Sequence, residues 1–172
     1  MTLAEAAARA DELAQAGDER ALADLRTQWA DEVEAAARDG DYRVRALAYR
    51  AVAQFRFRQK QELLRRGLED ESPACRGSAL LSLELLSRDH PGVVNGARSL
   101  LHTLANADPN AAVRRLAVIA LKNGSPHSDT LVLLDHIAES DEEDRELRAA
   151  AQRVSEALRK RARARPVGRQ RS

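Results

Sequence analysis

One short pattern returns four times along this 172-residue chain, and its spacing constrains the fold more than any other feature of the sequence. Each copy starts with an acidic residue, has an apolar residue five positions later, and places an arginine directly after that. The acidic residues are Asp39, Asp70, Asp108 and Glu142, and the apolar residues are Val44, Cys75, Val113 and Leu147. Because the copies lie 31, 38 and 34 residues apart, the chain is predicted to be an array of repeated structural units.

The residues that follow each apolar position predict an α-helix. Positions three, four, seven and eight further on are again apolar or small in all four copies, and such positions form one face of a helix. The fourth position is always alanine, so we expect another backbone to approach closely there. These alanines are Ala48, Ala79, Ala117 and Ala151.

The first turn of each helix carries polar signals. Ser72-Pro73 and Asp108-Pro109 predict an N-cap residue followed by proline at the first helical position. The arginines after the apolar positions lie about one turn into each helix, where we expect each to reach the acidic turn of a neighbouring copy. These arginines are Arg45, Arg76, Arg114 and Arg148. A ladder of ion pairs between copies is the predicted result.

Further helical segments complete each copy. Residues 18–38, 59–69, 91–106 and 127–139 also show helical periodicity and precede the four patterned helices, the first of which is expected to span 41–58. Each copy is therefore predicted to be a helical hairpin, and stacking of hairpins buries the apolar faces that one hairpin leaves exposed. With 44% hydrophobic but only 3% aromatic residues, the core must consist mainly of alanine and leucine, as in an all-α protein.

Three regions are expected along the chain. Residues 1–17 form an N-terminal capping helix, residues 18–160 form the array, and residues 161–172 form a basic, flexible tail. The first 17 residues carry charges that a secretion signal would lack, and no stretch approaches the length of a membrane span. A single cysteine, Cys75, excludes an internal disulfide. We therefore expect a cytoplasmic location.

The pattern resembles the HEAT repeat, in which an acidic turn is followed by Val-Arg and by alanine three residues after the arginine. The segments "DPNAAVRRLAVIAL" from Asp108 and "DGDYRVRALAYRAV" from Asp39 match well, whereas Cys75 and Leu147 replace the valine in the other copies. The resemblance covers about residues 18–160. It implies a short right-handed α-α superhelix of about four HEAT-like hairpins, and a non-enzymatic adaptor or scaffold that binds another protein.

Some HEAT-like families are enzymes, and their signatures were compared with the sequence. Deoxyhypusine hydroxylases ligate iron through His-Glu pairs, and the sequence contains no His-Glu dipeptide. HEAT-like alkylpurine DNA glycosylases need aromatics in a basic cleft, but Trp29 lies in an acidic block. The signatures of phycobilin lyases are too weak to test on residues. We predict no catalytic residue, cofactor or metal site.

Two residue types with chemical potential have simpler explanations. Cys75 occupies the position of Val44, so a small buried hydrophobe explains it better than a nucleophile does. The histidines at 90, 102, 127 and 136 show no i,i+4 pair and no cysteine partner, so they are expected at the surface rather than around a metal.

In an array of this kind the second helices mainly line the concave surface. Residues two, five, six and nine positions after each apolar residue are therefore the candidates for a partner-binding groove. We predict that the groove contains Tyr49, Arg50, Leu81, Arg115, Ile119, Lys122 and Arg153. Its apolar centre would be Leu80, Leu81, Val118 and Ile119 within a charged rim, as in many protein interfaces. The alternative is that these apolar residues pack between repeats.

An alternative function is association with nucleic acid through the tail and the basic block 41–66. Residues 159–172 hold seven basic and no acidic residues, and the tail candidates are Arg159, Lys160, Arg161, Arg163 and Arg165. In the block, Arg56 and Arg58 alternate with Phe55 and Phe57. This alternation suits a phosphate backbone, but it is also typical of a helix end, and the tail is equally able to fold back on the acidic segment 125–158.

Overall fold

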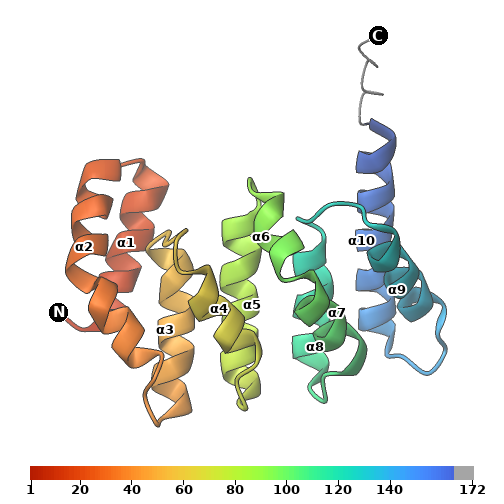
Figure 1. Cartoon of the computed structure of the whole chain (residues 1–172), viewed down its shortest axis with the longest axis horizontal. Coiled ribbons are helices and arrows are strands. Elements are labelled where there is room, and N and C mark those ends of the chain that lie inside the picture. The colour runs from red at the N-terminus through yellow and green to blue at the C-terminus, as the bar shows by residue number, and fades with distance from the viewer. Residues whose placement is uncertain (165–172) are drawn as a thin grey trace.

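The computed structural model describes residues 1–164, which contain ten helices and no strand (Figure 1). Their bounds are α1 (Leu3–Ala16), α2 (Glu19–Ala36), α3 (Tyr42–Gln54), α4 (Gln61–Leu68), α5 (Pro73–Ser87), α6 (Pro91–Gly96), α7 (Arg98–Ala107), α8 (Ala111–Leu121), α9 (Ser128–Glu139) and α10 (Arg145–Ala164). The all-α prediction is confirmed. None of the helices in this part of the chain has the length and hydrophobicity that a bilayer span requires.

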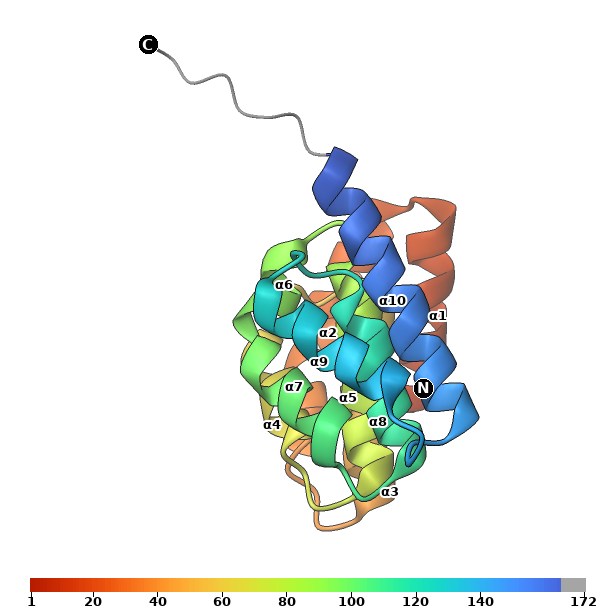
Figure 2. The ribbon, with the colours of Figure 1, turned by 90° about the vertical axis from the view of Figure 1, so that its right-hand side faces the viewer.

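The helices stand in two rows, seen from the side in Figure 1 and end-on in Figure 2. Row B consists of α1, α3, α5, α8 and α10, and successive members of this row pack directly on one another. Row A consists of α2, α4, α6 with α7, and α9, and α4, α7 and α9 each pack against the row-B helix that follows in the chain. The chain thus forms the HEAT-like solenoid of stacked hairpins that the repeated pattern predicts.

The repeated apolar face builds the core of the stack. Cys75, Val113 and Leu147 are buried, and Val44 is half-buried. The four alanines expected at close helix contacts are all fully buried. Gly67 of α4 lies so near α5 that a Cβ atom there would stand 2.8 Å from the Cβ of Ala79. Small side chains therefore set the distance between helices at this contact.

The start of α8 differs from the sequence prediction. Ser72 and Pro73 are the N-cap and first residue of α5, as expected, but α8 begins at Ala111 rather than at Pro109. Its N-cap is Asn110, whose side chain accepts a hydrogen bond from the backbone N–H of Val113. Asp108 does not cap α8 because its carboxylate instead accepts hydrogen bonds from Arg76 and from the backbone N–H of Asn110.

Three helix boundaries also differ from expectation. The helix predicted over 41–58 ends at Gln54, because Arg56 adopts a left-handed conformation with φ of 57° and turns the chain. The helix predicted over 91–106 is divided at Ala97 into α6 and α7. The last helix runs to Ala164, so residues 161–164 of the predicted tail are helical.

Candidate protein-binding face

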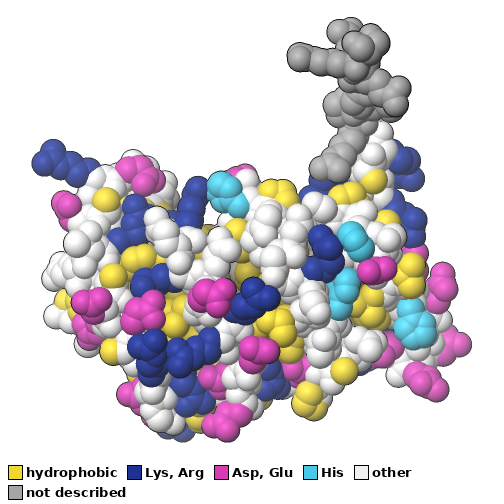
Figure 3. Space-filling model, in the orientation of Figure 1, with side chains coloured by type: hydrophobic (Ala, Val, Ile, Leu, Met, Phe, Trp, Pro, Cys, Tyr) yellow, Lys and Arg dark blue, Asp and Glu magenta, His cyan; other side chains and the backbone are white. Residues whose placement is uncertain are grey.

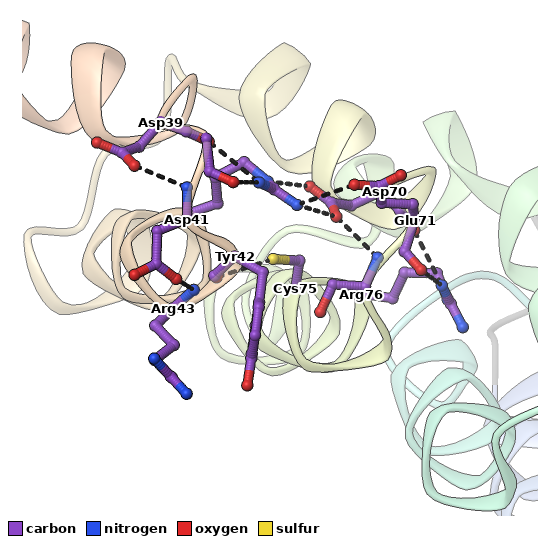
Figure 4. Close-up of polar contacts among 11 residues, drawn as sticks. Asp39, Asp41, Tyr42, Arg43, Asp70, Glu71, Cys75 and Arg76 are labelled. Atoms are coloured by element: carbon purple, nitrogen blue, oxygen red, sulfur yellow. Dashed lines mark hydrogen bonds and ion pairs between the residues drawn. The ribbon is translucent and has the colours of Figure 1, made fainter.

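The arginine of each repeated pattern joins its hairpin to the next. Arg45 donates two hydrogen bonds to the carboxylate of Asp70, at 2.9 and 3.1 Å, and Arg76 binds Asp108 in the same bidentate manner. Arg45 also donates to the carbonyl oxygens of Asp39 and Gly40 in its own turn. Figure 4 shows the turn at Asp70 and Glu71, and beside it the Sγ of Cys75 in α5, which donates to the backbone carbonyl oxygen of Tyr42 in α3. The predicted ladder is confirmed at these two rungs.

The third rung is displaced by one residue from its predicted acid. Arg114 binds the carboxylate of Glu143, at 2.6 and 2.8 Å, and not that of Glu142. Arg148 has no later hairpin to reach among the described residues, and it lies 3.6 Å from Asp141 in its own turn. Its Nε is buried and has no hydrogen-bond partner within residues 1–164.

The rungs are less exposed than ordinary surface ion pairs. The side chains of Asp70 and Asp108 are 8% and 3% exposed. Burial by itself raises the pKa of Asp70, but hydrogen bonds from Arg45 and from the backbone N–H of Ser72 outweigh burial and hold the pKa below its usual value. The hydrogen bond from Arg114 likewise lowers the pKa of Glu143. These hydrogen-bonded ion pairs fix how neighbouring hairpins stack.

Four residues at one helical position form a line across row B. Arg50 of α3, Leu81 of α5, Ile119 of α8 and Arg153 of α10 each lie six residues after the repeated apolar position. We call these four residues the cross-row line. Leu81 is 39% exposed, Ile119 is half-buried, and both arginines are exposed. The line therefore has an apolar centre between two cationic ends.

Three residues expected in the groove are buried instead. The side chain of Tyr49 is 1% exposed, and Leu80 and Val118 are also in the core. Leu80 and Val118 therefore pack between repeats, which is the alternative that the sequence left open. A Cβ on Gly67 of α4 would lie 3.0 Å from the ring of Tyr49, so Tyr49 packs beneath the next row-A helix and does not line an open groove.

The remaining groove candidates lie beside the cross-row line. Arg115 pairs with Glu146 of α10, and Lys122 is exposed at the end of α8. Glu84, nine positions after Cys75, is one of the groove candidates, and it forms an ion pair of 2.9 Å at the end of α5 with Arg88, which the sequence did not predict. Arg88 was missed because it lies thirteen positions after Cys75, beyond the positions considered.

The comparisons with known proteins agree with this arrangement of repeats. A family model described as HEAT repeats matches residues 30–95, which extend from within α2 into α6. Residues 30–95 of the chain are thus similar to HEAT repeats. No curated protein matches the chain. HEAT repeats generally mediate protein–protein interaction or scaffolding, and proteins built from them are typically non-enzymatic.

Most basic residues of the 41–66 block make contacts within the HEAT-repeat array. Arg56 binds Asp11 and the carbonyl oxygens of Ala53 and Gln54, and Lys60 binds Glu34 at 2.7 Å. Phe55 and Phe57 are buried with their ring centroids 5.2 Å apart. The alternation of basic and aromatic residues is therefore the end of α3 packed into the core.

Two arginines of the predicted tail also contact the array. Arg159 pairs with Asp135 of α9, which accepts a further hydrogen bond from Ser155. Arg161 donates to the carbonyl oxygens of Lys122 and Gly124. Lys160 and Arg163 are exposed on α10, and Arg165 lies outside the described residues.

Two histidines make polar contacts within residues 1–164. The hollow beside α6, of about 460 Å³, is lined by Leu86 and Val93, with Arg58 and His90 at 2.6 Å from each other. Burial lowers the pKa of His102, whose Nε2 lies 2.8 Å from the hydroxyl of Thr130. Among residues 1–164, no group of three His, Cys, Asp or Glu side chains is placed to hold a metal ion.

Proposed function

We propose that this HEAT-like array is a non-enzymatic adaptor or scaffold that binds a partner protein through the solvent-facing side of row B, the side expected to be concave. The observation that carries the proposal is the cross-row line, in which an exposed leucine and a half-buried isoleucine lie between exposed arginines. An apolar centre with a charged rim is the usual composition of a protein interface. The array of residues 18–160 supplies the face, with α1 extending row B.

Rigidity of the face favours recognition. Paired, largely buried ladder arginines hold α3, α5 and α8 in fixed register, so little conformational entropy is lost when a partner binds. Apolar contact at Leu81 and Ile119 supplies affinity, whereas Arg50, Arg115, Lys122 and Arg153 supply specificity through charge.

The experiment compares proteins captured by the wild-type chain and by two variants. Leu81→Asp with Ile119→Asp places two carboxylates in the apolar centre, and it should remove the partner while the far-ultraviolet circular dichroism stays unchanged. Val132→Asp is the matched control, because Val132 is 69% exposed on α9 in row A. A partner that survives the double substitution, or that is lost equally with Val132→Asp, contradicts binding through row B.

Association with nucleic acid is the weaker candidate. Arg45, Arg56 and Lys60 of the basic block, and Arg159 of the tail, are already paired with carboxylates of the chain. Each would have to exchange an internal partner for a phosphate, which weakens the phosphate contacts that supply most nucleic-acid affinity.

A further inference from the structure

The charges of the array are divided between its two rows. The five helices of row B contain 14 basic and six acidic residues, a net charge of +8. The row-A helices contain five basic and nine acidic residues, a net charge of −4. Four of the row-B cations are the ladder arginines, which leaves ten basic against six acidic residues on row B. The division is invisible in the linear sequence, where the two kinds of helix alternate.

The two faces also differ in how their charges are mixed. Figure 3 views the row-A side, where basic side chains gather near α4 with acidic side chains close around them. On row B, Arg50, Lys122 and Arg153 have no carboxylate within 4 Å among residues 1–164. Arg50 and Arg153 stand at the ends of the cross-row line and Lys122 follows Ile119 by one turn, whereas the carboxylates at the matching positions are Glu84, which is paired with Arg88, and Glu156. Cations therefore exceed carboxylates around the apolar centre, and the potential there is positive.

The geometry of the cross-row line sets the spacing of a complementary ligand. Its four residues occupy the same position on adjacent helices, and packed helices lie roughly 8–10 Å apart. Leu81 and Ile119 are thus separated by one such interval, and Arg50 and Arg153 by three. A polyproline II segment advances about 3.1 Å per residue with three residues per turn, so its side chains three positions apart lie on one face and cover one interval. A helix needs about seven residues for the same distance.

We propose that the partner contributes an acidic segment whose two apolar side chains contact Leu81 and Ile119 and whose flanking carboxylates pair with Arg50 and Arg153. This inference rests on the proposed function and names the chemistry of the partner. The apolar centre separates a protein segment from a nucleic acid, because a phosphate backbone has no side chain to bury against Leu81 and Ile119. Arg115 and Glu84 already form ion pairs within the chain, so they should contribute less to the preference for an acidic ligand.

The test is a random 16-residue peptide library displayed on phage and selected on the full-length chain. Enriched peptides should carry net negative charge and two apolar residues either three or seven positions apart. A synthetic copy of the most enriched peptide should lose about tenfold or more in affinity when its acids are replaced by lysines, and affinity should fall as salt rises. Enrichment of neutral or basic peptides whose binding still depends on Leu81 would overturn the inference that the partner is acidic. The proposed function would then remain.

Two variants and one competing probe separate the remaining outcomes. Arg50→Glu with Arg153→Glu changes exposed side chains, so folding should be unaffected, and affinity for the acidic peptide should fall by a similar factor. Unchanged affinity overturns the inference. Loss of all peptide binding with Val132→Asp but not with Leu81→Asp overturns the proposed function as well. A 20-base-pair DNA duplex that binds more tightly than the peptide, and competes with it, assigns row B to nucleic acid and also overturns the inference.

Discussion

At the scale of single residues, the distance between α4 and α5 depends on glycine at position 67. A Cβ at Gly67 would lie 2.8 Å from the Cβ of Ala79 and 3.0 Å from the ring of Tyr49, and all three residues are buried. Neither neighbour is a flexible side chain, so relief requires movement of a helix. The contact also explains why Tyr49 is available to the core and not to a ligand.

Gly67→Ala is therefore expected to destabilise the protein, although alanine is a better helix former than glycine by about 1 kcal/mol. Overpacking of this kind costs roughly 1–3 kcal/mol, which exceeds that gain. Gly77→Ala is the matched control, because the nearest atom to its added Cβ is Cδ1 of Leu116 at an ordinary 3.6 Å. Urea unfolding should show opposite signs for the two substitutions. Stabilisation by both would refute close packing at Gly67.

Sequence reasoning at this scale succeeded where one residue has one possible partner. The arginine after each apolar position follows the same acidic turn in every copy, so its ion pair with the next hairpin was predictable. It failed at Tyr49, because positions on a helical wheel do not reveal which side a neighbouring helix covers. Gly67 was the available signal, since a glycine inside a predicted helix often marks a close approach of another element. The shift from Glu142 to Glu143 was not predictable, because adjacent acids at one turn are equivalent in sequence.

At the scale of elements, the ladder joins hairpins that otherwise contact through small side chains. Its rungs are bidentate, and the carboxylates of Asp70 and Asp108 are nearly inaccessible to water. A buried pair is not stronger than a well-packed apolar pair, but removal of one partner leaves an uncompensated charge. Removal of a single ladder arginine should therefore lower the free energy of unfolding.

Arg76→Ala is expected to lower the free energy of unfolding by roughly 3 kcal/mol, because it leaves the carboxylate of Asp108 buried without a cation. Arg9→Ala removes an exposed pair with Glu12 and should cost less than about 1 kcal/mol. Chemical denaturation of both variants measures the difference. Equal costs would show that the ladder contributes no more than a surface ion pair does.

The helices themselves were largely predictable, and the interruptions between them were not. Alanine and leucine at helical spacing identify the patterned helices, whereas the end of α3 depends on tertiary contacts. Arg56 holds a left-handed backbone while its guanidinium binds Asp11 of α1, a partner 45 residues away. The residues around position 56 do not predict a contact with Asp11. The break at Ala97 between α6 and α7 differs, because Gly96 directly before it was an available signal that the sequence prediction did not use.

At the scale of the whole molecule, stacking converts a nearly neutral chain into an object with two different faces. The formal net charge is only +1, yet row B is strongly basic and row A acidic. Along the sequence, the acidic segment 125–158 and the basic block 41–66 lie far apart, and this order does not describe the surface. The two-row arrangement of the stacked hairpins gathers positive charge on the side that also exposes Leu81 and Ile119.

Binding at row B is most directly tested by nuclear magnetic resonance of isoleucine methyl groups during titration with the selected acidic peptide. The chain contains two isoleucines, Ile119 in the cross-row line and Ile137, which is 1% exposed within α9. The Cδ1 methyl signal of Ile119 should shift in proportion to bound peptide while that of Ile137 stays in place. Saturable peptide binding that leaves the Ile119 signal unmoved would contradict recognition by the row-B face.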